Sequence, residues 1–447
     1  MNRKHWLSEY EQKKATIEEA VQVVNSGDWV DFSLGVCAPI ELEKALAKRK
    51  NELEDVKIRS ILDVGPHHCL KADPQGEHLC WNSWHFSGID RKLSRQAVAY
   101  YIPMKFHELP QMIMDNHSDV FMLTAAPMDR HGWFNIGAAN AATWACVEKA
   151  KTVIVEVNHN VPRVLGGLHE SIHINQVDIV CESSNPPVPT LPVRSPSAAD
   201  WKIASLVMDY LEDGDCIQLG IGGTPNAVGL LIAQSDLKDL GVHTELYGDA
   251  YLEMCRQGKI TGARKQIDRY KQVFSFVLGS QELYEFVDDN PATISYPVNY
   301  VNKPDIIAAN DCFIAINGAL EVDLFGQICA ETIGTQHISG TGGQLDFVEG
   351  AYHSKGGKSL TCLSSTYTDK NGVVDSRIKP VLRTGAIATC PRTAAHIIVT
   401  EYGTAYLKGK STWERAEALI NIAHPDFRDE LIREAEALGI WRKTQRI

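Results

Sequence analysis

The chain has 447 residues, 44% of them hydrophobic and 22% charged, and its formal net charge is -12 at pH 7. These values are typical of a globular protein with two or three domains. The charge argues against a nucleic-acid-binding protein, which normally has a basic surface, but not against an anion held by backbone N–H groups. The first 20 residues contain no apolar run, no apolar stretch reaches about 18 residues, and the 11 cysteines form no C-x-x-C pair. We therefore expect a cytoplasmic protein with reduced thiols and no membrane span.

The first half alternates apolar runs with helical patterns, which predicts α/β layers. Residues 119–129 (DVFMLTAAPMD) and 151–158 (KTVIVEVN) have strand patterns, and residues 39–53 (PIELEKALAKRKNEL) have a helical one. Residues 66–80 contain ligand types suited to zinc, but their spacing fits no standard motif. We predict a loop with buried thiols and surface histidines there rather than a metal site; the residues are His67, His68, Cys69, His78 and Cys80.

Five prolines in residues 183–200 (SSNPPVPTLPVRSPSAAD) indicate a linker. We expect an N-terminal domain over 1–185 and a C-terminal domain over 186–447. In the second half, residues 198–214 predict a helix and residues 396–402 (HIIVTEY) a strand, and the tail predicts two helices divided near Pro425. Alternating residues around Asn317-Gly318 predict a β-hairpin with a two-residue turn.

The two halves share a faint repeat. Residues 27–46 (GDWVDFSLGVCAPIELEKAL) and 214–233 (GDCIQLGIGGTPNAVGLLIA) both run from Gly-Asp through a strand and a small-residue turn into a helix. This similarity favours two related α/β domains facing each other across a cleft, although strand-turn-helix units are common enough to coincide by chance.

Two glycine-rich loops in the second half suit a phosphorylated ligand. In residues 218–231 (QLGIGGTPNAVGLL), glycines allow close approach of a ligand, and the helix start that follows offers N–H groups to an anion. The loop lacks the Lys-Ser/Thr of a P-loop, so a tight turn that binds nothing remains an alternative. Residues 337–360 (HISGTGGQLDFVEGAYHSKGGKSL) contain a second such loop, followed by Lys355 and Lys358. Two loops favour a large anionic ligand.

Several side chains are candidates for chemistry. Glu245, in residues 240–249 (LGVHTELYGD), is a carboxylate already ionised at pH 7, which suits attack on an activated acyl group such as a thioester. An ordinary surface acid is the alternative, and Glu331 is a second candidate nucleophile. The remaining candidates have blander interpretations: Glu321 and Asp323 on a strand, and His131 and His243 as loop-orienting residues rather than acid–base groups. No G-x-S-x-G motif is present, which disfavours a serine esterase.

Taken together, these stretches resemble the acetyl-CoA hydrolase/transferase family, which includes 4-hydroxybutyrate, butyrate and acetate CoA-transferases. The resemblance extends over nearly the whole chain. It rests on the following segments in the same order: APMDRHGWFNIG, IHINQVD, SPSAAD, LGIGGTPNAV, LGVHTELYGD, GQICAETIG, ISGTGGQLDF, VTEYGTAYLKGKS and ERAEALINIAHPDFR. The resemblance implies two open α/β domains of the CoA-transferase type, related to the NagB/RpiA fold.

The resemblance also implies roles for individual residues. Glu245 matches the family's catalytic glutamate, and Val36 is an uncertain match for a backbone donor to the oxyanion. The residues implied to contact CoA are Gly222, Gly223, Thr224, Pro225, Asn226, Gly342, Gly343 and Lys358. Coenzyme A enters as the acyl-CoA co-substrate, no metal is needed, and a homodimer or tetramer is expected.

The expected activity is exchange of CoA between short-chain carboxylates, with butyryl-CoA and acetate or 4-hydroxybutyrate and acetate as the favoured pairs. It would run through a glutamyl-CoA thioester on Glu245. An acyl-CoA hydrolase is the alternative enzyme, because water reaching that intermediate converts transfer into hydrolysis. A CoA-binding sensor without catalysis is the alternative outside enzymes.

Overall fold

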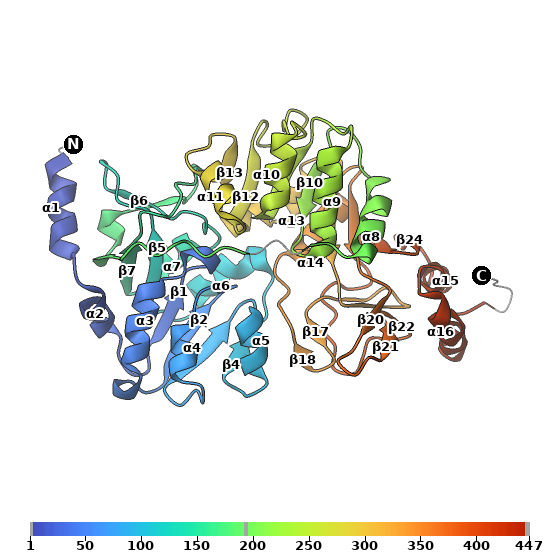
Figure 1. Ribbon diagram of the computed structural model, residues 1–447, viewed down its shortest axis with the longest axis horizontal. Coiled ribbons are helices and arrows are strands. Elements are labelled where there is room, and N and C mark those ends of the chain that lie inside the picture. Colours follow the sequence, from blue (N-terminus) through green and yellow to red (C-terminus); the bar gives the residue numbers. More distant parts are fainter. Residues whose placement is uncertain (1–2, 192–194, 443–447) are drawn as a thin grey trace. The chain divides into compact units, whose positions relative to one another are not determined.

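The computed structural model describes residues 3–191 and 195–442 (Figure 1). Its contacts divide the chain into two compact units. Unit 1 comprises the described residues up to 191 together with 245–249 and 273–301, and unit 2 comprises the remainder. Residues 192–194, in the expected linker, lie outside the described residues. Within the described linker residues there is no helix or strand before Ala198.

A seven-stranded parallel sheet in the order β4-β3-β2-β1-β5-β7-β9 forms the centre of unit 1. Its strands are β1 (Trp29–Phe32), β2 (Val56–Ser60), β3 (Leu79–Ser83), β4 (Ala99–Tyr101), β5 (Val120–Ala125), β7 (Thr152–Val157) and β9 (Ile179–Glu182). β5 is buried along its whole length, as expected for a parallel sheet covered on both faces. The helices are α1 (Arg3–Lys13), α2 (Ile17–Ala20), α3 (Ile40–Lys48), α4 (His68–Ala72), α5 (Gly88–Ser94), α6 (Leu109–Asp115) and α7 (Thr143–Lys149), and β6 (Trp133–Asn135) pairs with β8 (Ser171–His173).

The second sheet has eight strands in the order β13-β12-β11-β10-β14-β19-β23-β24. The strands are β10 (Cys216–Leu219), β11 (Gly241–Tyr247), β12 (Gln272–Val277), β13 (Thr293–Ser295), β14 (Phe313–Gly318), β19 (Lys358–Cys362), β23 (Ile397–Thr400) and β24 (Gly403–Tyr406). β10 pairs in parallel with both β11 and β14, and β24 is the antiparallel edge strand beside β23.

Helices follow these strands as the alternating sequence pattern predicts. They are α8 (Ala198–Met208), α9 (Gly223–Gln234), α10 (Asp249–Arg256), α11 (Gln281–Val287), α12 (Val298–Val301), α13 (Pro304–Ala308), α14 (Gln344–His353), α15 (Thr412–Asn421) and α16 (Pro425–Ala437). Of these elements, β12, β13, α11 and α12 belong to unit 1. Unit 2 also contains the short strands β15 (Glu321–Asp323), β16 (Ile328–Cys329), β17 (Thr332–Ile333), β18 (Gln336–His337), β20 (Thr366–Thr368), β21 (Val374–Ser376) and β22 (Ile378–Lys379). α8 packs on α9, and α14 packs on β14 and β19.

The two sheets have the same topology over seven strands. β1 and β10 are each flanked by the next strand in the chain on one side, and by β5 or β14 on the other. This agreement supports the interpretation of residues 27–46 and 214–233 as equivalent units. The expected α/β fold is therefore confirmed, as are the strands at 119–129, 151–158 and 396–402 and the tail helices divided at Pro425.

The hairpin predicted at Asn317-Gly318 is wrong. Both residues belong to β14, which pairs in parallel with β10 and β19, and β15 instead pairs with β16 and β22. The Asn317 side chain lies inside the sheet and exchanges two hydrogen bonds with Gln218, of 3.1 and 3.0 Å. This buried amide pair replaces the local turn that the Asn-Gly dipeptide favours.

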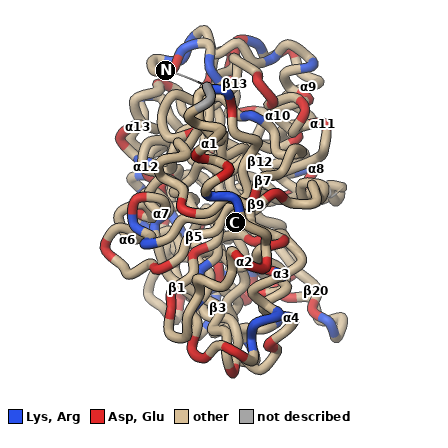
Figure 2. Tube along the Cα trace, turned by 90° about the vertical axis from the view of Figure 1, so that its left-hand side faces the viewer, with Lys and Arg blue, Asp and Glu red and all other residues tan. Residues whose placement is uncertain are grey.

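Charged side chains are distributed over both units. Figure 2 shows Lys and Arg interspersed with Asp and Glu along the trace. Among residues 3–191 and 195–442, no helix is long and apolar enough to cross a membrane.

Candidate active site

Glu245 lies near the carboxyl end of β11, the neighbour of β10 in the eight-stranded sheet. It is the only half-buried residue of this strand, and the other six are buried. Ligands of open α/β sheets bind at the carboxyl ends of the strands, so the position suits a functional side chain.

The chain directly after Glu245 is held firmly within unit 1. The Asp249 carboxylate accepts hydrogen bonds from the Ser280 N–H and hydroxyl. Tyr284 donates to the Pro189 carbonyl at 2.7 Å and accepts from the Gly279 N–H. Burial raises the pKa of the Tyr284 phenol, and the nearby Cys37 and Asp249 raise it further. Tyr284 therefore lies within electrostatic range of both the segment after Glu245 and the turn that contains Cys37.

Val36 occupies that turn, a short 3-10 helix over Gly35–Cys37 that follows β1. Gly35 has φ +54°, and its N–H donates to the Ile61 carbonyl at 3.2 Å. Within the described ranges the buried Val36 N–H donates to no protein acceptor. A buried N–H without a partner costs folding free energy unless a ligand or water accepts a hydrogen bond from it. The Val36 N–H is therefore suited to the expected role of donor to the oxyanion.

The first glycine loop connects β10 to α9 in unit 2. Gly222 has φ +134°, a conformation that only glycine adopts readily, and it directly precedes α9. In the described part of the chain, the N–H groups of Ile221, Gly222, Gly223 and Thr224 donate to no protein acceptor. Asp200 accepts a hydrogen bond from the Thr224 hydroxyl, and its carboxylate lies against Gly223. A bound phosphate would therefore be favoured on the Ile221–Gly222 side, away from this acid.

The second glycine loop lies at the same edge of the sheet. Gln344, the first residue of α14, donates from its side chain to the Gly318 carbonyl at the end of β14 at 3.0 Å. β10 ends beside β14, because the Gly220 N–H donates to the Ile316 carbonyl at 2.8 Å. Outside the masked residues, the N–H groups of Gly342 and Gly343 also have no protein acceptor. The structure thus brings Gly222–Asn226 and Gly342–Gly343 to one edge of unit 2.

Lys358 lies away from that edge. It opens β19 opposite Ile314, near the start of β14, whereas Cys362 at the far end of β19 lies opposite Gly318. Four residues of parallel strand span about 13 Å. The Lys358 ammonium donates to the Tyr210 carbonyl at 3.3 Å. The structure therefore does not bring Lys358 together with the glycine loops, and we leave it out of the site proposed below.

Each of the other candidate side chains contacts another side chain of the protein. Glu331 is 3% exposed and accepts hydrogen bonds from Thr389 and Thr341. Glu321 forms an ion pair with Arg383, and Asp323 accepts from the Gln327 side chain. His243 is fully buried beside Phe313, and the exposed His131 accepts from the Arg130 side chain at 3.0 Å.

The histidine and cysteine segment at 66–80 is only partly as predicted. Cys69 is buried as expected, but Cys80 is half-buried and His67 is buried, at 6% exposure. The segment is also not a loop throughout, because His68–Ala72 form α4 and β3 begins at Leu79. The Cys69 N–H donates to Glu43, whose pKa is raised to about 8 by burial and the nearby Asp63. Within the described part of the chain, no three His, Cys, Asp or Glu side chains are arranged to hold a metal ion.

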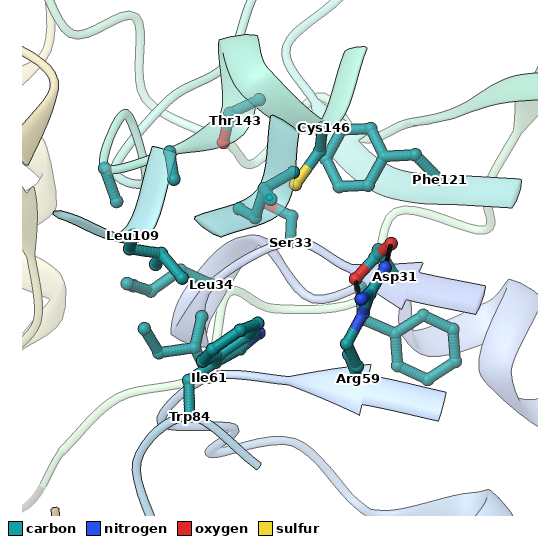
Figure 3. A pocket seen from close by; sticks show the side chains of 14 residues that line it. Asp31, Ser33, Leu34, Arg59, Ile61, Trp84, Leu109, Phe121, Thr143 and Cys146 are labelled. Atoms are coloured by element: carbon teal, nitrogen blue, oxygen red, sulfur yellow. Dashed lines mark hydrogen bonds and ion pairs between the residues drawn. The ribbon is translucent and has the colours of Figure 1, made fainter. Parts of the chain in front are cut away.

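A buried ion pair in unit 1 escaped the sequence analysis. Arg59 on β2 donates two hydrogen bonds of 2.7 Å to Asp31 on β1, and Ser118 donates a third to the same carboxylate. Both charged side chains are at most 4% exposed. They line a cavity of about 20 Å³ with Ser33, Ile61 and Trp84 (Figure 3). This volume is enough for about one water molecule.

Comparisons with known proteins agree with the resemblance seen in the sequence. Residues 1–192 match the acetyl-CoA hydrolase/transferase N-terminal domain and residues 279–435 the C-terminal domain. The chain is 55% identical to the probable butyrate:acetyl-CoA coenzyme A-transferase of Syntrophomonas wolfei, covering 99% of both chains. It is 52% identical to the butyryl-CoA:acetate CoA-transferase of Anaerostipes caccae, covering 98% of this chain and 99% of the relative.

Solved structures show the same relationship. RipA from Yersinia pestis superposes with a TM-score of 0.89 at 37% identity, over 97% of this chain and 99% of RipA. The sequence matches extend over both halves, and the structural match confirms their α/β architecture. The chain therefore belongs to the acetyl-CoA hydrolase/transferase family.

Proposed function

We propose that this chain is a short-chain acyl-CoA:carboxylate CoA-transferase, with butyryl-CoA and acetate as the first substrate pair, and with Glu245 as its nucleophile. The observation that carries the proposal is the edge of unit 2 at which two glycine loops present backbone N–H groups without protein acceptors. Such donors suit the phosphates of CoA. The names of the relatives from Syntrophomonas wolfei and Anaerostipes caccae support the substrate pair. Cytoplasmic location and assembly into a homodimer or tetramer belong to the same proposal.

The proposed reaction is a two-stage exchange that conserves the thioester. The Glu245 carboxylate attacks the acyl-CoA carbonyl and expels CoA thiolate, which leaves an acyl-glutamyl anhydride. The thiolate then attacks the glutamyl carbonyl, forming a glutamyl-CoA thioester and releasing the first carboxylate. A second carboxylate attacks that thioester, and the same steps in reverse deliver the new acyl-CoA and regenerate Glu245. No net change in thioester bonds occurs, so the exchange needs no external energy source.

Each attack produces a tetrahedral oxyanion that needs a preorganised donor. The Val36 N–H is our proposed donor, because the turn around it is fixed by Gly35 and the N–H has no acceptor in the described residues. One donor of this kind contributes about 3 kcal/mol to the stability of the transition state. Hydrolysis is the competing outcome, since water that reaches the anhydride or the glutamyl thioester ends the exchange.

The proposal predicts that Glu245 becomes covalently attached to CoA. Incubation with butyryl-CoA in the absence of acceptor should leave CoA on the peptide containing residue 245, and borohydride should reduce the thioester to an alcohol detectable by mass spectrometry. Glu245→Ala should lower carboxylate-dependent exchange by at least about 10⁴-fold, as expected for loss of a nucleophile, while CoA binding persists. A label on Glu331 would instead make that residue the nucleophile.

The same assay separates the alternative functions. Exchange that requires added acetate indicates a transferase, and thiol release without acetate indicates a hydrolase. Saturable CoA binding with neither activity indicates a sensor and would contradict the proposal.

A further inference from the structure

We propose that Glu331 is a positioning residue that holds the second glycine loop, residues 338–343, in the shape that binds CoA. The inference rests on the proposed function, because CoA is taken as the ligand of this loop. It assigns Glu331 a role different from the nucleophile considered in the sequence analysis. The evidence lies within unit 2, in the hydrogen bonds that converge on this one residue.

Glu331 lies between β16 and β17 and is 3% exposed. The Thr389 hydroxyl donates to its carboxylate at 2.9 Å, and the Thr341 hydroxyl lies 3.3 Å from each of its two oxygens. The Glu331 carbonyl accepts from the N–H groups of Ile338 and Ser339, at 2.7 and 3.3 Å. Side chain and backbone of one residue therefore fix both the start and the middle of the loop.

The neighbouring residue reinforces these contacts. The Ala330 N–H donates to the Thr389 hydroxyl at 2.9 Å, and the Ser339 hydroxyl donates to the Ala330 carbonyl at 3.1 Å. Thr389 thus accepts from Ala330 while it donates to Glu331, so its hydroxyl proton has one defined direction. The two oxygens of a carboxylate both accept hydrogen bonds, which suits a site where hydroxyl groups converge as donors.

The loop held in this way leads directly to the proposed CoA contacts. Gly342 follows Thr341 with φ +52°, and Gly343 caps α14. Gln344 then anchors the helix to Gly318 at the edge of the sheet. Loss of the Thr341–Glu331 contact would free the chain on the amino-terminal side of Gly342 and Gly343, so their N–H groups would no longer be held in one direction. The hydrogen bond from Gln344 to Gly318 would still hold the carboxyl-terminal side. We therefore expect weaker binding of CoA without loss of the chemical step.

The test is the separation of binding from turnover in Glu331→Ala. We expect a roughly tenfold rise in the KM for butyryl-CoA and in the Kd for CoA, with kcat within about threefold, as for loss of buried hydrogen bonds. Glu331→Gln keeps one acceptor oxygen and should recover most of the affinity. Thr341→Val removes one hydroxyl and should raise the KM by about threefold; it also serves if Glu331→Ala does not fold.

Glu321 offers a matched control, since it is equally buried at 3% exposure and lies in the same unit, but is paired with Arg383. Glu321→Gln should change the KM for butyryl-CoA by less than twofold, whatever its effect on thermal stability. An unchanged KM in Glu331→Ala would overturn the inference, and so would a loss of kcat alone, which would make Glu331 catalytic.

Amide exchange makes the inference independent of the proposed function. In Glu331→Ala, the backbone amides of residues 338–343 should exchange at least tenfold faster than in the unaltered protein. In Glu321→Gln, the same amides should exchange at the rate of the unaltered protein. If the unaltered protein neither binds CoA nor exchanges acyl groups, the proposed function fails, yet faster amide exchange would still support the positioning role. Unchanged amide exchange would overturn it.

Discussion

The central strands of the two sheets, β1 and β10, each bury a polar side chain, but they pair it with different chemical groups. Each begins two residues after a glycine, in Gly27-Asp28 and Gly214-Asp215, and each carries a buried polar side chain at its third position. In β1 this is Asp31, which pairs with a charged arginine on β2. In β10 it is Gln218, which pairs with the neutral amide of Asn317 on β14. The related topology thus tolerates either an ion pair or an amide pair in its centre.

The loops that follow these strands differ in exposure. Residues 33–38 are all buried, whereas Ile221 is 50% exposed and Gly222 is exposed as well. Both loops contain a glycine with positive φ and N–H groups without protein acceptors in the described residues. The two turns differ in geometry as well as in exposure, since Gly35 has φ +54° and Gly222 has φ +134°. The exposed loop suits an extended ligand such as CoA, and the buried turn suits a single reacting oxygen.

The largest expected effect is on folding stability, and it compares the Asp31–Arg59 pair with the Gln218–Asn317 pair. Arg59→Met leaves the Asp31 charge buried without its bidentate partner, and such losses cost about 3–5 kcal/mol of folding stability. Gln218→Met leaves the neutral Asn317 amide unsatisfied, which costs about 1–3 kcal/mol. Chemical denaturation of both variants measures the difference. Equal losses would show that the charge of the unit 1 pair adds nothing to its structural role.

Paired substitutions provide the control for this prediction. Asp31→Leu combined with Arg59→Met removes both charges, and replacing a buried pair by apolar residues of similar size is often neutral or stabilising. The double variant should therefore be more stable than Arg59→Met alone. A further loss of stability would indicate that the apolar side chains do not fit beside the small cavity.

A smaller effect, on enzyme kinetics, should distinguish the turn at Gly222 from the turn at Gly35. Gly222→Ala places a Cβ that meets only the Pro225 ring at 3.9 Å, so its cost is backbone strain of about 1–3 kcal/mol at φ +134°. We expect about a tenfold higher KM for butyryl-CoA. Gly35→Ala is also strained, at φ +54°, but should lower kcat about tenfold by moving the Val36 N–H. Steady-state kinetics of both variants measure these effects. If both variants changed only KM, or both changed only kcat, the proposed difference between a CoA-binding loop and an oxyanion turn would be contradicted.

Local patterns in the sequence were sufficient for the strands at 119–129, 151–158 and 396–402, for the helices at 39–53, 198–214 and in the tail, and for the strand-turn-helix unit at the first glycine loop. These depend on periodicity and on glycine between strand and helix. The Asp31–Arg59 pair could not be predicted, because it depends on the register that places these residues opposite each other on β1 and β2. The Asn317-Gly318 turn failed for a related reason, since a partner 99 positions away outweighed a local preference. Glu245 was singled out by resemblance and not by its neighbours.

Lys358, which the resemblance implies to contact CoA, gives the smallest expected effect, because it lies away from the glycine loops. Only 15 positions separate it from Gly343, but the 10 residues of α14 lie between them. A helix of that length carries the chain about 15 Å, from the edge with the glycine loops towards the opposite edge of the sheet. There the ammonium group donates to the Tyr210 carbonyl and lies within electrostatic range of Asp215.

We therefore expect Lys358→Met to change the KM for butyryl-CoA by less than twofold, and to cost at most about 1 kcal/mol of stability through the lost hydrogen bond. The measurement is the same exchange assay, with Gly222→Ala as the variant that should respond. A tenfold rise in KM for Lys358→Met would place part of CoA at the amino edge of the sheet. In that case the exposed loop at Ile221–Gly222 would no longer mark the cofactor edge of unit 2, and its contrast with the buried turn of unit 1 would need another explanation.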